Sequence, residues 1–183
     1  MTDQTPPPGP GQPLTGPATG TRPGELLDRF LARLVDGILL AVVDGIVVTG
    51  IVVGAIMGDS NGFFYGASGY AAGAVSAVLS AALYLAYFGY LESTRGQSVG
   101  KMVMKLRVLG PQGGNPTLEQ SLRRNCWVAF GVLGVVPVIG GLVGEIASLV
   151  AAIMIAVGIN KDTVNRQAWH DRFAGGTQVV KEG

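Results

Sequence analysis

Residues 126–159 read CWVAFGVLGVVPVIGGLVGEIASLVAAIMIAVGI, a run of 34 residues with a single charged side chain. As one α-helix this run would be about 51 Å long, whereas the hydrocarbon core of a bilayer is about 30 Å thick. The run therefore has to bend. Pro137 followed by the glycine pair 140–141 supplies the place, because proline interrupts helical hydrogen bonds and glycine turns at little cost. The pattern predicts helices over about 122–136 and 141–159, with a re-entrant hairpin as the alternative because the first is short.

Two further apolar stretches precede this run, at about Leu34–Met57 and Gly69–Leu91, and each is long enough to cross a bilayer as a helix. The whole chain is 48% hydrophobic and only 14% charged, whereas a soluble domain is about one-quarter charged. We therefore expect an all-α integral membrane protein. Its predicted architecture is a four-helix transmembrane bundle, in which the third and fourth segments are either two spans or a re-entrant hairpin.

The basic residues lie in three parts of the chain: before the first span, between the second and third, and after the fourth. They are Arg22, Arg29, Arg33, Arg95, Lys101, Lys105, Arg107, Arg123, Arg124, Lys161, Arg166, Arg172 and Lys181. The loops 58–68 and 137–140 contain none. Because cytoplasmic loops of membrane proteins are enriched in Lys and Arg, we expect both termini and the central loop to be cytoplasmic, with Asp59 outside. Anionic lipid headgroups are then expected partners of the basic face.

The first 23 residues hold seven of the ten prolines and cannot bury apolar surface. We therefore expect a disordered cytoplasmic tail over 1–23 and a membrane domain over 24–181. The tail lacks the basic start and apolar core of a signal peptide, so the first hydrophobic helix is expected to remain in the mature protein. The tail is interpreted as a solvated leader, with docking to a partner protein as the alternative.

Cys126 and His170 are the only cysteine and histidine, which is too few for a zinc site. We expect no metal, no cofactor and no nucleic acid partner. An enzyme would need a nucleophile or paired acids near His170 and Asp171, and no recognised motif supplies these. The sequence therefore does not indicate an enzyme.

Arg29, Arg33 and Asp36 are spaced by four and three residues, which places them on one face of the first helix. An arginine pair at the cytoplasmic edge can hold Asp36, which lies about one turn inside the membrane. The alternative is a purely local ion pair that anchors the helix end and neutralises a costly carboxylate.

Asp44 lies eleven residues beyond Arg33, hence about 16 Å deeper and close to the middle of the bilayer. A carboxylate at that depth is expensive, which makes Asp36 and Asp44 candidates for a stepwise path of protons or sodium. Glu145 on the last helix could continue this path. The alternatives are a permanently protonated Asp44 bonded to a neighbouring helix, and a Glu145 that lies in the outer headgroup region.

Apolar and basic side chains alternate along residues 101–108, with Lys101, Lys105 and Arg107 on one side. This period of two predicts a short extended segment at the membrane surface, its basic side toward lipid phosphates. Leu106–Leu109 and Thr177–Val180 are both short β-prone runs, and we expect them to pair as a two-stranded sheet under the bundle.

Several of these segments together resemble the RDD family of bacterial membrane proteins, which is named for one arginine and two aspartates. The spacing of Arg29, Ala32 and Asp36 is similar to the family's first-helix signature. Three further parts of the chain are also similar to the family. They are the central loop (Gly96–Lys101 through Leu106–Val108), the start of the third helix (Leu122–Asn125) and the C-terminal segment (Gln167–Asp171 with Thr177–Val180). The resemblance covers roughly residues 25–181.

The resemblance implies that Asp171 is the second aspartate, so that Arg29, Asp36 and Asp171 form a triad in which both carboxylates converge on the guanidinium. It implies a multi-pass protein of the bacterial plasma membrane. The family's activity is mostly unassigned, but transport and cation/proton antiport are associated with some members. We therefore expect a small transporter or ion-coupled permease, with an accessory or scaffold subunit of a larger membrane complex as the alternative. A membrane-protein partner or a second copy of the chain is an expected partner.

Overall fold

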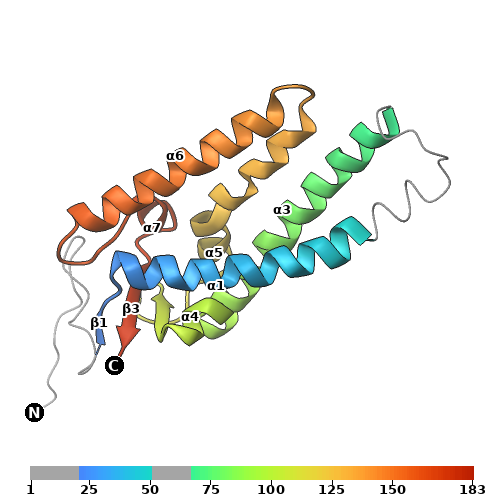
Figure 1. Cartoon of the computed structure of the whole chain (residues 1–183). Coiled ribbons are helices and arrows are strands. Elements are labelled where there is room, and N and C mark those ends of the chain that lie inside the picture. Colours follow the sequence, from blue (N-terminus) through green and yellow to red (C-terminus); the bar gives the residue numbers. More distant parts are fainter. Residues whose placement is uncertain (1–20, 51–66) are drawn as a thin grey trace, which may run out of the picture.

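The computed structural model describes residues 21–50 and 67–183, and its long helices share one end with a small sheet (Figure 1). The first helix, α1 (Leu26–Asp44), continues directly into a π-helix, η1 (Gly45–Thr49). The helix predicted over 69–91 is confirmed as α3 (Ala67–Arg95). Residues 51–57 of the predicted first span, and the loop containing Asp59, lie outside the described residues.

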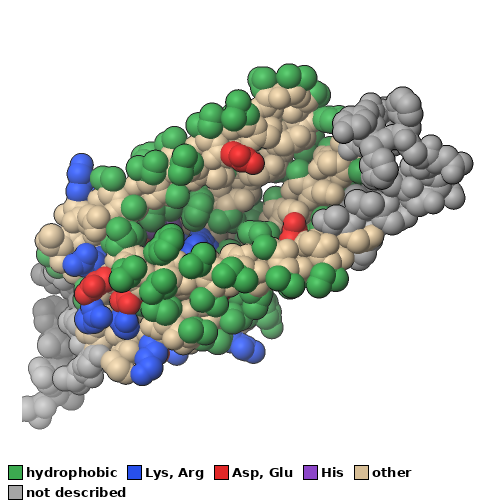
Figure 2. All heavy atoms as spheres, in the orientation of Figure 1, with side chains coloured by type: hydrophobic (Ala, Val, Ile, Leu, Met, Phe, Trp, Pro, Cys, Tyr) green, Lys and Arg blue, Asp and Glu red, His purple; other side chains and the backbone are tan. Residues whose placement is uncertain are grey.

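Two helices of the described chain are long and apolar enough to cross a membrane: Tyr70–Arg95 within α3, and α6 (Gly140–Lys161). Only 17% of the most apolar stretch of each is buried in the molecule, whereas the core helix of a soluble protein is mostly buried. Figure 2 shows hydrophobic side chains over the outer surfaces of α6 and α1. The molecule is thus mostly helical, with two candidate membrane-spanning helices, and the helix predicted over 141–159 is confirmed.

The third apolar segment differs from the single α-helix predicted over 122–136. An α-helix, α5 (Leu118–Asn125), begins earlier, behind a capping box formed by Thr117 and Gln120. The chain then continues as a 3-10 helix, η2 (Cys126–Val135), which at a rise of about 2.0 Å per residue covers about 20 Å. The prediction was wrong because apolar length does not distinguish an α-helix from a 3-10 helix. Since η2 is shorter than the bilayer core of about 30 Å, it does not cross it alone.

The helices η2 and α6 run antiparallel and are joined by a tight turn at the predicted proline (Figure 1). Val138 in this turn has a φ of 69° and is fully exposed. The two helices pack closely, because a Cβ on Gly140 or Gly144 would lie 1.9 Å or 2.5 Å from a carbonyl oxygen of η2. Glycine is therefore required at both positions.

A three-stranded antiparallel sheet lies at the other end of the long helices, in the order β1 (Thr21–Pro23), β3 (Gln178–Glu182), β2 (Leu106–Leu109). The predicted pairing of the two β-prone runs is confirmed, with Leu106 opposite Lys181 and Leu109 opposite Gln178. Residues 21–23 were assigned to the disordered tail, and here the prediction was wrong: they pair with the remaining edge of β3. Together with Ala32 of α1, side chains of β2 and β3 form a small apolar core.

The segment before β2 is helical rather than extended. Ser98 caps a short helix, α4 (Val99–Val103), and its hydroxyl accepts a hydrogen bond from the N–H of Lys101 at 3.4 Å. Serine at this position favours a helix start, which overrides the alternation of apolar and basic residues. The extended structure predicted over 101–108 is therefore found only in β2. A second short helix, α7 (Trp169–Phe173), precedes β3.

Candidate functional site

Nine polar side chains from five helices meet where the long helices join the sheet. We call them the polar cluster: Arg29, Arg33, Asp36, Glu92, Lys101, Arg124, Asn125, His170 and Asp171. Its three carboxylates are at most 1% exposed. Because a buried charge is unfavourable unless it is paired, the partners of each group decide which of them hold the fold and which remain free to bind.

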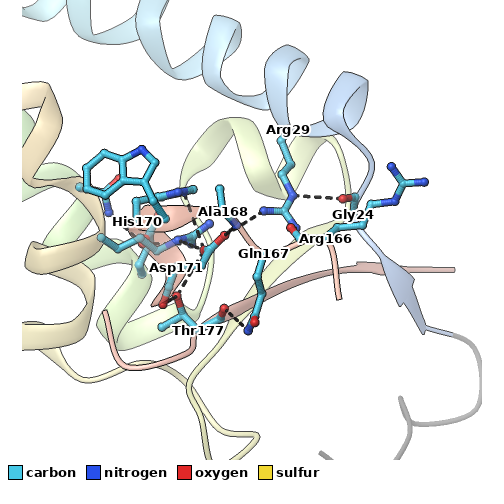
Figure 3. A network of polar contacts seen from close by, with 12 residues as sticks. Gly24, Arg29, Arg166, Gln167, Ala168, His170, Asp171 and Thr177 are labelled. Carbon is cyan, nitrogen blue, oxygen red and sulfur yellow. Dashed lines mark hydrogen bonds and ion pairs between the residues drawn. The ribbon is translucent and has the colours of Figure 1, made fainter. Parts of the chain in front are cut away.

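Asp171 is bonded through both carboxylate oxygens (Figure 3). Its Oδ1 accepts hydrogen bonds from Nε of Arg124 at 2.8 Å and from the hydroxyl of Thr177 at 3.3 Å. Its Oδ2 lies 3.4 Å from Nη1 of Arg29 and accepts a hydrogen bond from the backbone N–H of Ala168 at 3.1 Å. The carboxylate therefore caps α7 and links it to α1 and α5. The predicted contact between Arg29 and Asp171 is confirmed.

Arg29 has two further acceptors besides Asp171 (Figure 3). Its Nη2 donates to the carbonyl oxygen of Arg166 at 2.7 Å, and its Nε donates to that of Gly24 at 3.1 Å. One guanidinium thus joins the start of α1 to a residue before that helix and to the segment between α6 and α7. A lysine could not serve all three acceptors with the same planar fork.

The acceptors of Arg29 do not include Asp36, so the triad prediction was wrong for this residue. The two oxygens of Asp36 accept hydrogen bonds from the hydroxyl of Tyr87 at 2.7 Å, the hydroxyl of Ser98 at 2.6 Å and the N–H of Gly100 at 2.6 Å. The reason is the close approach of α4, since a Cβ on Gly100 would lie 2.0 Å from a carbonyl oxygen of α1. These donors satisfy Asp36, which joins α1, α3 and α4.

Glu92, near the end of α3, is the second acid that the cluster surrounds with cations. It forms a short ion pair with Lys101, accepts a hydrogen bond from Nδ2 of Asn125 at 3.0 Å, and lies 3.6 Å from Nη1 of Arg124. Lys101 is 8% exposed, so the prediction that it faces lipid phosphates was wrong. A fully buried carboxylate requires a cation, and Lys101 is the one that α4 brings to it.

Arg33 is held by aromatic rings rather than by a carboxylate. Its guanidinium lies 4.0 Å from the ring centroid of Phe88 and 5.1 Å from that of Trp127. Its Nη2 donates a hydrogen bond to Oδ1 of Asn125 at 2.9 Å. Nη1 is buried and has no hydrogen-bond partner among the described residues.

Burial has the largest influence on the pKa values of Lys101, His170 and Asp171. Burial alone would raise the pKa of Asp171, but Arg124 and Arg29 outweigh it and the pKa falls to about 2. Burial lowers the pKa of His170 to about 3, although Asp171 opposes this. Burial likewise lowers the pKa of Lys101 to about 8, although the negative charge of Glu92 acts to raise it. Near neutral pH, His170 is therefore uncharged and Asp171 is ionised.

Asp44 lies apart from the polar cluster, at the last residue of α1, and borders a cavity of about 190 Å³. Ser80 and Tyr84 of α3 also line this cavity. Within the described part of the chain, Oδ1 of Asp44 is buried without a hydrogen-bond partner. The π-helix η1 begins directly after this residue, and such π-turns within helices are frequent at functional sites.

Glu145 is exposed on α6 and does not line the cavity at Asp44. Asp36 is satisfied by its own donors and lies in the polar cluster. The three acids that were predicted to form a path therefore do not share one cavity. Among residues 21–50 and 67–183, no group of three or more His, Cys, Asp or Glu side chains is placed to hold a metal ion.

Sequence reasoning missed four members of the cluster: Glu92, Lys101, Arg124 and Asn125. One signal was available. Glu92 is an isolated acid near the end of an apolar helix, and an acid in such a helix is energetically unfavourable unless it is paired. Its cations could have been sought among the basic residues of the central loop.

Comparison with known protein families agrees with the resemblance described in the sequence analysis. The model of the RDD family matches residues 23–175, which is most of the chain. No curated protein and no solved structure matches. The family is membrane-associated, in agreement with the two long apolar helices. The chain belongs to the RDD family.

Proposed function

We propose that the chain is a small ion-coupled permease of the bacterial plasma membrane, in which Asp44 binds a proton and a small cation in turn. The observation that carries this proposal is the buried carboxylate oxygen of Asp44, which has no hydrogen-bond partner among residues 21–50 and 67–183 and lies beside a cavity of about 190 Å³. Ser80 and Tyr84 add hydroxyl oxygens to the same cavity. Carboxylate, hydroxyl and water oxygens are the ligands that small hard cations prefer.

The proposed membrane arrangement has four segments and cytoplasmic termini. It is supported by the grouping of basic residues around the sheet and the polar cluster, while the described turn between η2 and α6 contains no lysine or arginine. In this arrangement α1 with η1, α3 and α6 cross the bilayer. The η2 segment enters beside α6, which keeps the re-entrant hairpin as a form of the same topology.

In this scheme the polar cluster holds the cytoplasmic ends of the helices together. Asp171 and Glu92 tie α3, α5 and α7 through Arg124, and Asp36 fixes α4 against α1. Because the hydrogen bonds of Asp36 are satisfied within the fold, we assign it a structural role and leave Asp44 as the ion-binding carboxylate.

The proposal is tested by cation-driven proton movement in liposomes that contain the purified protein and an internal pH indicator. An inward sodium or potassium gradient should change the internal pH for the wild-type protein and for Asp44→Glu. Asp44→Asn should abolish the change. Glu145→Gln is the matched control, because it neutralises an exposed acid outside the cavity, and it should retain the full response.

Equal flux through the wild-type protein and Asp44→Asn would refute the role of Asp44. Absence of flux in the wild-type protein would refute the permease itself. Stable co-purification of partner subunits from the native membrane would then favour the accessory role.

A further inference from the structure

A second cavity, of about 170 Å³, lies between α1 and α6 at the end of both helices that meets the polar cluster. Its walls are mostly apolar and include Phe30 of α1 with Ile155 and Ile159 of α6. Figure 2 shows the hollow between these helices, with histidine and basic side chains at its base. It shares no lining residue with the cavity at Asp44.

Four side chains that line this cavity have a buried nitrogen without a hydrogen-bond partner among the described residues. The atoms are Nη1 of Arg33, Nη1 of Arg124, Nε1 of Trp127 and Nδ1 of His170. Arg124 and His170 are only 4% and 6% exposed. Nη1 of Arg124 lies 3.6 Å from Glu92, which is beyond hydrogen-bonding distance. The nitrogens of Arg33, Arg124 and Trp127 are hydrogen-bond donors, whereas Nδ1 of the neutral His170 is not counted as one, because its Nε2 faces the carboxylate of Asp171. Each unpaired buried donor costs about 1–3 kcal/mol, so a group that accepts hydrogen bonds is favoured here.

The charges of the polar cluster do not cancel. It contains four cations (Arg29, Arg33, Lys101, Arg124) and three carboxylates (Asp36, Glu92, Asp171), while burial keeps His170 neutral. Four minus three leaves one positive charge in excess. An enclosed charge without a counter-ion is unfavourable, and an anion in the adjoining cavity would supply the counter-ion.

We propose that this cavity binds an anionic group carried on an apolar chain, with Arg33 and Arg124 holding the anion and the chain lying against α1 and α6. The phosphodiester of an anionic lipid and the carboxylate of a fatty acid share this chemistry, and both match the forked geometry of a guanidinium. The volume exceeds the roughly 150 Å³ of a cavity that holds benzene, so the anion and its first methylenes fit.

The position of the cavity favours a chain-bearing anion over a free one. In the proposed orientation, the basic ends of α1 and α6 lie at the depth of the cytoplasmic headgroups, and the apolar walls face the acyl chains. The inference does not rest on ion transport at Asp44.

Trp127 lines the cavity and provides the probe. The chain has two tryptophans, so Trp169→Phe leaves Trp127 as the only one. This variant is reconstituted in phosphatidylcholine vesicles and titrated with brominated phosphatidylglycerol, brominated fatty acid or brominated phosphatidylcholine, whose bromine atoms quench tryptophan on contact. One of the two anionic compounds should reach half-maximal quenching at a mole fraction about tenfold lower than brominated phosphatidylcholine, the effect of one charge-assisted hydrogen bond. The stronger of the two identifies the source of the anion.

Two variants test the cavity by different means. Arg33→Gln removes the unpaired Nη1 of Arg33 together with its positive charge and should abolish the tenfold preference. Ala156→Phe fills the cavity from α6 without changing any charge and should also weaken quenching. Leu149→Phe, on the exposed face of α6 outside the cavity, is the matched control and should leave quenching unchanged. Melting midpoints in detergent verify that each variant is folded.

Equal quenching by anionic and zwitterionic chains would overturn the proposal. So would an anionic preference that survives in both Arg33→Gln and Ala156→Phe. Asp44→Asn should leave the quenching unchanged, so failure of the permease proposal can be distinguished from failure of this one.

Discussion

Asp171→Ala removes a carboxylate that two guanidiniums share, Arg124 at 2.8 Å and Arg29 at 3.4 Å. Both guanidiniums are largely buried, with side chains 5% and 9% exposed. Removing one partner of a buried ion pair costs about 3–5 kcal/mol, because the other charge is left unpaired. Arg124→Ala should cost a similar amount, since it leaves Asp171 with only the longer ion pair. At about 2–4 °C per kcal/mol for a chain of this size, either change should lower the melting midpoint by about 6–20 °C.

The geometry also predicts which losses are independent. Asp171 and Arg124 share one interaction, so the double variant should cost less than the sum of the two single changes, by about 0.5–3 kcal/mol. Asp171 and Asp36 have no hydrogen-bond donor in common. Their losses should therefore add to within about 0.5 kcal/mol.

Thermal unfolding in detergent can be followed with a thiol-reactive fluorophore, because the single cysteine, Cys126, is half-buried in the fold. Asp171→Asn keeps an acceptor for the N–H of Ala168 and separates the lost charge from the lost hydrogen bonds. Additive losses for Asp171 and Arg124 would refute the shared ion pair. Strong coupling between Asp171 and Asp36 would restore the triad that the geometry rejects.

Three further predictions concern packing, pH and topology. Gly100→Ala should destabilise the protein by about 1–3 kcal/mol or more, because the new Cβ meets the backbone of α1 at 2.0 Å. Gly37→Ala, with nothing within 4 Å of the new Cβ, should not lower the melting midpoint. Burial holds the pKa of His170 near 3, whereas an unfolded histidine titrates near 6.5, so the unfolded state binds the proton first as the pH falls. The free energy of unfolding should therefore decline by about 5 kcal/mol between about pH 6.5 and pH 3. His170→Gln should remove that part of the decline. In a cysteine-free background, a cysteine at Lys161 should be labelled only from the cytoplasm and one at Val138 only from outside, and the reverse pattern would contradict the proposed topology.

The elements that sequence reasoning predicted correctly depend on local pattern. Apolar length and the proline with its glycine pair were sufficient for α6 and for the turn before it, because a helix in lipid satisfies its own backbone. The pairing of β2 with β3 followed from two β-prone runs that each needed a partner. The contact between Arg29 and Asp171 was inferred from the family resemblance, since the two residues are 142 positions apart.

The errors arose where a distant segment decides the outcome. Helical spacing places Arg29 and Asp36 on one face, but the close approach of Gly100 brings the amide of α4 to Asp36 instead. The burial of Lys101 depends on Glu92, and strand β1 depends on the edge that β3 offers. None of these contacts has a sequence period that could reveal it.

The most direct test of ion coupling is whether Asp44 exchanges a proton for a cation. Purified protein in weakly buffered detergent should release about one proton per chain when sodium or potassium is added, because a cation that binds a carboxylate displaces its proton. Glu145→Gln should release the same amount and Asp44→Asn none. Release from Asp44→Asn equal to that from the wild-type protein, or no release from the wild-type protein, would contradict a role for Asp44 in ion coupling.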